Sequence, residues 1–355
     1  MTLFSSLPLR GVTLRNRIVV SPMCQYSSDD GFANDWHLVH LGQFAAGGAA
    51  VVFTEAAAVT ADGRISPQDL GLWKDEHVEV LARIGRFVEG QGAVFGIQLA
   101  HAGRKASTGR PWEGGGPVDV SHGGWTKLAA PSALAFDARS QTPDALDEPG
   151  IARVVSAFRA AARRALNAGM GAIELHAAHG YLLHEFLSPL ANVRTDRYGG
   201  SFDNRIRLVL EVAAAVREVW PERLPLFARL SVTDWRDDGW TPDDSVALAR
   251  RLGEYGVDVI DCSSGGIVPA PTIPLGPGYQ VALAEKIRRE GGVRTAAVGL
   301  ITGAAQADTI VRSGQADLVV LAREMLRRPH WALLAAHELG VDVPWPPQYR
   351  RAKPR

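Results

Sequence analysis

The chain has 355 residues, of which 46% are hydrophobic and 21% charged, so it can bury a full core and is not a disordered polymer. Its 38 Lys and Arg residues balance 38 Asp and Glu residues, which argues against a sequence-independent grip on nucleic acid, and its most apolar stretch, 42–59, is too broken for a membrane helix. The only cysteines, Cys24 and Cys262, exclude a disulfide framework and favour the reducing cytoplasm.

Short apolar runs alternate along the chain with amphipathic helical segments. The predicted strands cover 17–20, 50–54, 93–99, 172–175, 226–230, 257–262, 295–298 and 318–321. The predicted helices cover 36–46, 75–91, 149–168, 202–220, 242–255, 279–289, 304–313 and 329–339. Eight β/α units in series favour a closed (β/α)8 barrel, a TIM barrel of the α/β class, because closure leaves no strand edge exposed. We expect one domain over residues 1–355.

Two long segments interrupt this alternation. The first, about 104–149, is rich in Gly and Pro, and the second covers 176–201. Both follow a predicted strand, so we expect them on the barrel face where active sites of this fold are built. The tail at about 340–355 contains prolines and cannot continue the last helix.

Polar or small residues stand at or just after the end of every predicted strand. In chain order they are Ser21 to Cys24, Glu55 and Ala56, Gln98, His176 and His179, Arg229, Ser263, Gly299, and Arg323. The C-terminal ends of barrel strands meet at one mouth, so these residues predict an active site there. His176 and His179 lack a third ligand at a convincing spacing, so we expect no metal. No Gly-x-Gly-x-x-Gly segment follows a strand, which argues against a dinucleotide-binding domain.

Several long motifs resemble the flavin-dependent Old Yellow Enzyme family, over about residues 3–351. They are SPMCQY, TEAAAV followed by DGRIS, GIQLAHAGRK, ELHAAHGYLLHEFLSPLANVRTDRYGGSFDNR, FARLS and DCSSGG. The cysteine of SPMC resembles the subclass of YqjM-type and thermophilic-like ene-reductases and xenobiotic reductases. The RPWEG segment at 110–114 is closer to the xenobiotic reductases.

This resemblance implies a function. It implies a tightly but non-covalently bound FMN, reduction by NADPH or NADH, and reduction of activated C=C bonds in α,β-unsaturated carbonyl compounds, with nitro compounds as further substrates. A dienoyl-CoA-reductase-like enzyme is an alternative, but its iron–sulfur cluster needs more cysteines than the chain has. A flavin-binding barrel without turnover, or a flavin-free aldolase or isomerase, would have no use for Arg229, Gln98 and Tyr181 together.

The resemblance also assigns the cofactor contacts. They fall to Ser21, Pro22, Met23, Cys24, Ala56, Gln98, Arg229, Ser263, Gly299, Ala322 and Arg323. Arg229 would face the N1/O2 edge of the flavin, although its residue type alone favours an ion-paired barrel arginine. Gly299, Ala322 and Arg323 would hold the phosphate. The family usually has Gly where Ala322 stands, so a positive φ there would force the loop to shift.

The same resemblance implies the catalytic roles. His176 and His179 would donate hydrogen bonds to the substrate carbonyl oxygen, and Tyr181 would protonate Cα. Tyr26 would also reach the substrate oxygen. Lys105 reads equally well as an entrance residue or a solvated lysine. Two tryptophans of the insertion, Trp112 and Trp125, would either shape the pocket or anchor the loop.

The tail raises a question of assembly. Within the YqjM-type subclass a Q-Y-x-R tail crosses a dimer interface, and Arg351 is the matching position. The resemblance therefore implies a homodimer or homotetramer in which Arg351 lines a neighbouring substrate site. The plain alternative is a solvated basic end. We expect small-molecule partners only, with no nucleic acid and no membrane.

Overall fold

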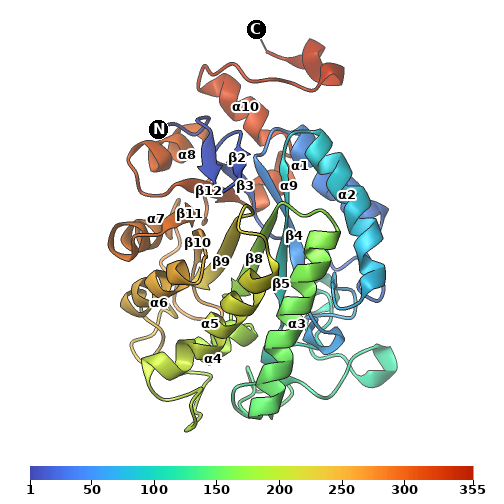
Figure 1. Cartoon of the computed structure of the whole chain (residues 1–355), viewed down its shortest axis with the longest axis vertical. Coiled ribbons are helices and arrows are strands. Elements are labelled where there is room, and N and C mark those ends of the chain that lie inside the picture. The colour runs from blue at the N-terminus through green and yellow to red at the C-terminus, as the bar shows by residue number, and fades with distance from the viewer. Residues whose placement is uncertain (355) are drawn as a thin grey trace.

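A closed barrel of parallel strands forms the centre of the computed structural model, which describes residues 1–354 (Figure 1). Around the barrel the strands are β3 (Ile18–Val20), β4 (Val51–Ala58), β5 (Val94–Ala100), β8 (Ala172–Ala177), β9 (Leu226–Ser231), β10 (Val259–Ser263), β11 (Arg294–Ala297) and β12 (Leu318–Leu321). Every neighbouring pair is parallel, and β12 pairs with β3 to close the ring. The predicted (β/α)8 barrel is confirmed.

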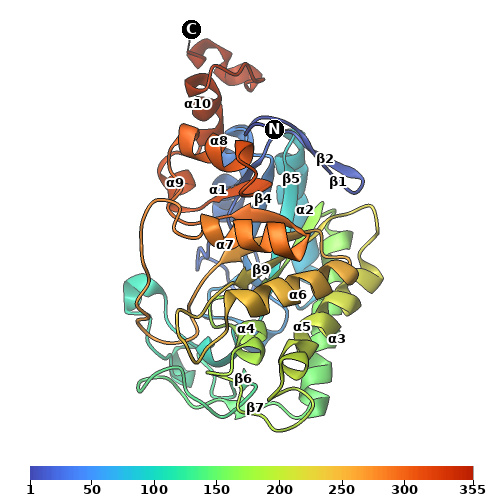
Figure 2. The same cartoon turned by 90° about the vertical axis from the view of Figure 1, so that its left-hand side faces the viewer.

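Helices surround the barrel (Figures 1 and 2). The predicted ones are α1 (Asp35–Ala46), α2 (Val78–Gly90), α3 (Glu148–Asn167), α5 (Phe202–Val219), α6 (Pro242–Glu254), α7 (Val281–Lys286), α8 (Ala304–Arg312) and α10 (Trp331–Glu338). Local sequence sets their starts: the Thr241 side chain accepts a hydrogen bond from Asp244, and Pro242 occupies the first turn of α6.

The element boundaries differ from the predicted ones in five places. A register shift between Phe53 and Ala56 lets β4 run on to Ala58, so Glu55 and Ala56 do not end that strand. A short 3₁₀ turn precedes α2, and a π-helical turn at Ile287–Gly291 replaces the last part of the predicted helix at 279–289. His176 lies within β8, and Ser263 is the last residue of β10.

Several short elements were not predicted. The helices are α4 (Leu182–Leu187) and α9 (Arg323–Arg327), and 3₁₀ turns lie at Ala61–Gly63, Gly103–Lys105, Pro111–Glu113, Val120–His122 and Pro347–Ala352. The insertion also contains a two-stranded parallel pair, β6 (Ala129–Ala130) and β7 (Asp144–Ala145). β6 and the turn at Gly103–Lys105 contact α4, so the insertion packs over the same end of the barrel as α4 (Figure 2).

An antiparallel hairpin of β1 (Leu7–Leu9) and β2 (Val12–Leu14) precedes the barrel. Its leucines cluster with Val51 and Phe53 of β4 and with Phe227 of β9, which point into the barrel. This hairpin therefore closes the end of the barrel where the strands begin.

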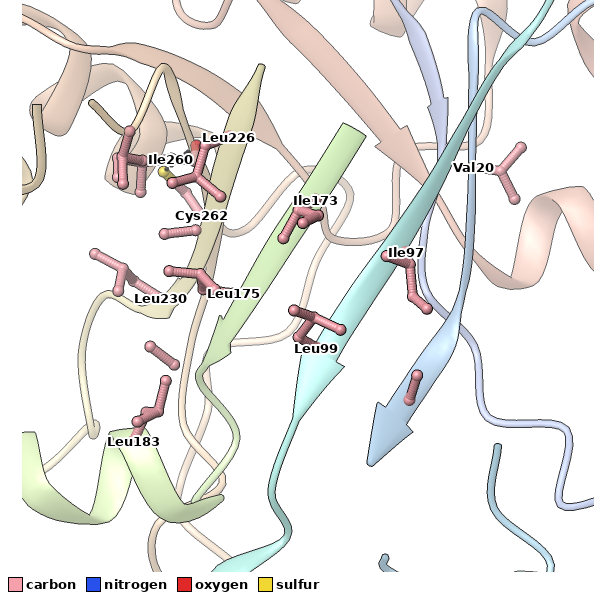
Figure 3. Packing of buried hydrophobic residues seen from close by; sticks show 14 of the residues in the cluster. Val20, Ile97, Leu99, Ile173, Leu175, Leu183, Leu226, Leu230, Ile260 and Cys262 are labelled. Atoms are coloured by element: carbon pink, nitrogen blue, oxygen red, sulfur yellow. Dashed lines mark hydrogen bonds between the residues drawn. The ribbon is translucent and has the colours of Figure 1, made fainter. Parts of the chain in front are cut away.

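The outward faces of the strands form the main core between sheet and helices. Figure 3 shows Ile97, Leu99, Ile173, Leu175 and Cys262 among these side chains, which belong to one buried cluster. Because successive side chains of a strand point to opposite faces, the residues between them point into the barrel. No helix within residues 1–354 has both the length and the apolar character needed to cross a membrane.

Candidate active site

Polar side chains fill the barrel interior near its C-terminal end. The alternation that sends Ile97 and Leu99 outward turns Gln98 inward, and the same rule turns Glu174, His176, Arg229 and Asp261 inward on β8, β9 and β10. All five are buried.

Arg229 is held by ion pairs across the barrel. Its Nε lies 2.9 Å from Asp261 Oδ2 and 3.5 Å from Glu174 Oε1, and its Nη2 donates to Ser21 Oγ at 3.0 Å. Gln98 Nε2 donates to the same Glu174 oxygen at 2.7 Å. Burial disfavours the guanidinium charge, but the carboxylates of Asp261 and Glu174 outweigh it and raise the pKa of Arg229.

A cavity of about 330 Å³ opens above this cluster. It runs from Ser21, Pro22, His179, Arg229 and Ser263 to Gly299, Ala322 and Arg323 after the last two strands. Gly299 has a φ of +123°, and a Cβ there would lie 2.8 Å from Gln280 Nε2. Ala322 has a φ of −109°, so the alanine needs no left-handed backbone and the loop does not have to shift for it.

The His-Ala-Ala-His-Gly-Tyr segment makes a sharp turn at the end of β8. His179 and Gly180 both adopt positive φ, +60° and +74°. The His176 ring meets the His179 ring edge-on at 5.2 Å and the Tyr181 ring at 4.9 Å, so the predicted catalytic residues lie together. The His179 backbone N–H donates to Ser231 Oγ at 2.9 Å, and its Nε2 lies 2.6 Å from Ser263 Oγ.

Buried side chains hold this turn from two sides, and His184 and Asp234 among them were not predicted from the sequence. The Gly180 N–H donates to His184 Nδ1, whose other ring nitrogen lies 2.9 Å from Asp234 Oδ1, and both side chains are fully buried. From the opposite side, Lys105 Nζ donates to the carbonyl oxygens of His179 at 2.8 Å and Gly266 at 2.5 Å. Lys105 is thus neither a solvated lysine nor only an entrance residue.

Burial sets the protonation of the clustered groups. It lowers the pKa of both His176 and His179 well below the usual value, and the nearby Arg229 charge adds to this effect. It raises the pKa of Tyr181 well above the usual value. Near neutral pH the imidazoles are therefore uncharged and the phenol keeps its proton.

The segment after β3 lies along the opposite wall. The Gln25 N–H donates to Glu55 Oε2 at 2.8 Å, which fixes the chain beside β4. Burial, followed by the nearby charges of Asp69 and Glu55, raises the pKa of the Cys24 thiol. Tyr26 has a φ of +50°, and its ring meets the Trp112 ring edge-on at 5.8 Å.

A second cavity, of about 230 Å³, lies beneath the insertion. Tyr181 lines it together with Lys105, Phe136, Gly116 and Pro117. Trp125 anchors this loop, because its Nε1 donates to the Asp62 carbonyl at 3.1 Å, whereas Trp112 is 63% exposed.

Arg351 does not reach the mouth of its own barrel. The tail follows α10 at the end of the molecule opposite α4 and β6 (Figures 1 and 2). It is exposed there, and Lys353 pairs with Asp342. Within residues 1–354, no group of three or more His, Cys, Asp or Glu side chains could hold a metal ion.

Comparisons with known proteins show the family of the chain. The pattern of the NADH:flavin oxidoreductase / NADH oxidase family matches residues 2–341. An NADPH dehydrogenase of Geobacillus sp. (strain WCH70) is 49% identical over 98% of both chains, and an NADPH dehydrogenase of Bacillus subtilis (strain 168) is 46% identical over the same shares.

Solved structures give the same result. Morphinone reductase in complex with tetrahydroNAD is 25% identical, with a TM-score of 0.79 over 98% of this chain and 93% of its own. A further structure of morphinone reductase gives a TM-score of 0.80 over 96% of this chain and 90% of its own. The chain therefore belongs to the NADH:flavin oxidoreductase / NADH oxidase family, the Old Yellow Enzyme family, and is an FMN-dependent oxidoreductase of NAD(P)H.

Proposed function

We propose that this enzyme reduces the activated C=C bond of α,β-unsaturated carbonyl compounds, and of the corresponding nitro compounds. The observation that carries the proposal is the meeting of His176, His179 and Tyr181 beside the cavity over Arg229. Reduction of a conjugated carbonyl compound requires hydrogen-bond donors to its oxygen and a proton donor to its Cα. The two neutral imidazoles and the protonated phenol supply these groups.

The residues of the cavity fit FMN. Arg229 lines the cavity with a planar guanidinium, and Gln98 lies beside it through their shared partner Glu174. The left-handed Gly299 leaves room where a Cβ would meet Gln280. We assign the cofactor contacts to Ser21, Pro22, Met23, Cys24, Ala56, Gln98, Arg229, Ser263, Gly299, Ala322 and Arg323. Arg323 supplies a guanidinium for the phosphate. When bound, FMN supplies the two-electron chemistry that links the nicotinamide to the substrate.

The two imidazoles bind the substrate carbonyl oxygen. His176 Nδ1 is buried and has no hydrogen-bond partner among residues 1–354, so this polar atom is available to a ligand. Neutral imidazoles donate N–H groups without carrying charge, and they stabilise the negative charge that grows on the oxygen as the alkene is reduced. Tyr26 reaches the same oxygen from the opposite wall.

Tyr181 delivers the proton to Cα. Its raised pKa keeps the phenol protonated throughout the neutral range, so the proton is present when the carbanion-like carbon forms. Its ring also lines the cavity beneath the insertion, which opens a path for the larger part of the substrate.

A two-stage anaerobic experiment tests this function. NADPH or NADH should bleach the flavin absorption of the holoenzyme, and a cyclic enone added afterwards should restore it with formation of the saturated ketone. A flavin that NADPH bleaches but no enone or nitroalkene reoxidises would contradict the proposal.

Assembly and location are part of the proposal. The tail is too far from its own mouth to act there, so Arg351 can line a substrate site only on a neighbouring chain. We propose a homodimer or a homotetramer built from such pairs, located in the cytoplasm.

A further inference from the structure

Two buried carboxyl groups share a single cation inside the barrel. Asp261 and Glu174 are each 1% exposed, and Nε of Arg229 faces both, at 2.9 Å from Asp261 Oδ2 and 3.5 Å from Glu174 Oε1. If both carboxyls were ionised, the cluster would carry a net negative charge on buried side chains, which is costly.

The two carboxyl oxygens that do not contact Arg229 indicate where a proton neutralises the excess negative charge. Glu174 Oε2 and Asp261 Oδ1 are buried and have no donor among residues 1–354, although the two side chains lie within hydrogen-bonding reach of each other. Two acceptor oxygens can face each other only when a proton lies between them. We propose that Glu174 and Asp261 share one proton beneath Arg229, so that the three side chains form an electrically neutral unit.

Among residues 1–354, Arg229 is the only cation paired with Glu174 or Asp261, so no second cation takes the place of this proton. Gln98 on β5 is neutral and donates to Glu174, and the imidazoles of His176 and His179 are uncharged because of their burial. On β4, Glu55 is turned away to the Gln25 N–H and the ring of His37.

The shared proton sets the net charge of the three side chains beneath the flavin. This consequence rests on the FMN position given in the proposed function. Burial and the neighbouring Asp261 raise the pKa of Glu174 to about 8, although Arg229 opposes them. Above that pH the unit loses its proton and becomes negative. A negative unit disfavours a reduced flavin that itself carries negative charge, so the reduction potential should fall.

Infrared spectroscopy of the holoenzyme tests the proton directly. The difference between the wild-type and Glu174→Gln spectra should contain a protonated carboxyl C=O band near neutral pH, because other buried carboxyls such as Glu185 contribute equally to both spectra. Glu185→Gln is a matched control, because Glu185 is a second fully buried glutamate, on α4 and hydrogen-bonded to the Arg104 N–H instead. Burial also raises the pKa of Glu185 to about 8, so this variant should lose a different carboxyl band and keep that of Glu174. A wild-type spectrum identical to that of Glu174→Gln would overturn the proposal. If that variant does not fold, Asp261→Asn should also lose the band, because Glu174 then ionises to pair with Arg229.

Measuring the flavin reduction potential as a function of pH tests the functional consequence. Below the pKa of Glu174 the wild type and Glu174→Gln should have similar potentials, because a protonated carboxyl and an amide are both neutral. Above it the wild-type potential should fall increasingly below that of the variant, and Glu185→Gln should follow the wild type. Parallel curves for wild type and Glu174→Gln would overturn this role. Enone reduction is measured in a separate assay. A lack of enone reduction would contradict the proposed function but would not change the infrared or the potentiometric result.

Discussion

The backbone N–H of Gly180 donates a 2.9 Å hydrogen bond to Nδ1 of His184. Because Nδ1 accepts, a ring proton lies on Nε2, which is 2.9 Å from Asp234 Oδ1. Asp234 in turn accepts from Ser188 Oγ at 2.6 Å and from the Trp240 N–H at 2.7 Å. This buried chain of contacts holds the left-handed turn that presents His179 and Tyr181.

Removing the negative end of this chain should misplace the turn. Asp234→Asn leaves the His184 ring without its carboxylate, and breaking a buried pair typically costs about 3–5 kcal/mol of stability. We expect weaker binding of phenolic ligands and slower enone reduction in the variant that folds, with FMN content preserved. Asp238→Asn, at an exposed aspartate of the same loop, is the control. Equal phenol affinity in both variants would show that the pair does not position the turn.

Lowering the pH should remove the stability that the Asp234 carboxylate contributes. Burial opposes ionisation of Asp234, but His184, Ser188 and the Trp240 N–H outweigh it and lower its pKa below the usual value of about 3.8–3.9. The native state therefore gains stability from Asp234 above about pH 4, and this gain is lost as the pH falls through the lowered value. Denaturant unfolding at a series of acidic pH values should show the difference between wild type and Asp234→Asn shrinking. A constant difference would contradict this linkage.

Replacing Tyr181 with Phe should separate the two half-reactions. The oxidation of NADPH needs no phenol proton, so flavin bleaching should keep its rate. Reoxidation by an enone should slow by roughly a hundredfold to ten-thousandfold, the usual contribution of a general acid. Stopped-flow absorbance measures both stages. Unchanged reoxidation would remove Tyr181 from the role of proton donor.

Replacing both His176 and His179 with Ala should abolish the carbonyl-binding site. Phenolates resemble the charged oxygen of the reacting substrate, so their charge-transfer band with the flavin should fade while FMN remains bound. Titration of the holoenzyme with a phenol at constant pH measures the affinity. A band of full intensity in the double variant would contradict the oxygen-binding role.

Replacing Arg351 should lower turnover because its side chain lines the substrate site of a neighbouring chain. We expect light scattering after size exclusion to give at least a dimer, and Arg351→Ala to lower enone turnover more than FMN content. Truncation after Trp345 should have the same effect. A fully active monomer would end the idea of a shared site.

The barrel could be predicted because apolar strand runs and amphipathic helices alternate along the whole chain. The hairpin at Leu7–Leu14 escaped notice because each strand has three residues, too few to show a period. The length of β4 was wrong because a register shift at Phe53 to Ala56 is a tertiary feature without a turn signal.

The site was only partly visible in the sequence. The positions of His176, His179 and Tyr181 follow from their distance to a strand end. The pairing of His184 with Asp234 joins residues of two different β/α loops, and no local pattern reports such a contact. Glu174 did leave a signal, since a charged residue inside an apolar strand must point into the barrel and needs a partner there.

The hairpin of β1 and β2 has a kinetic consequence. With Leu7, Leu9 and Leu14 sealing one end of the barrel, everything that approaches the cavity above Arg229 must come through the other end. A nicotinamide and an enone that use the same entrance obstruct each other. An excess of either reactant should therefore slow consumption of the other, and the oxidised nicotinamide must depart before the enone can take its place.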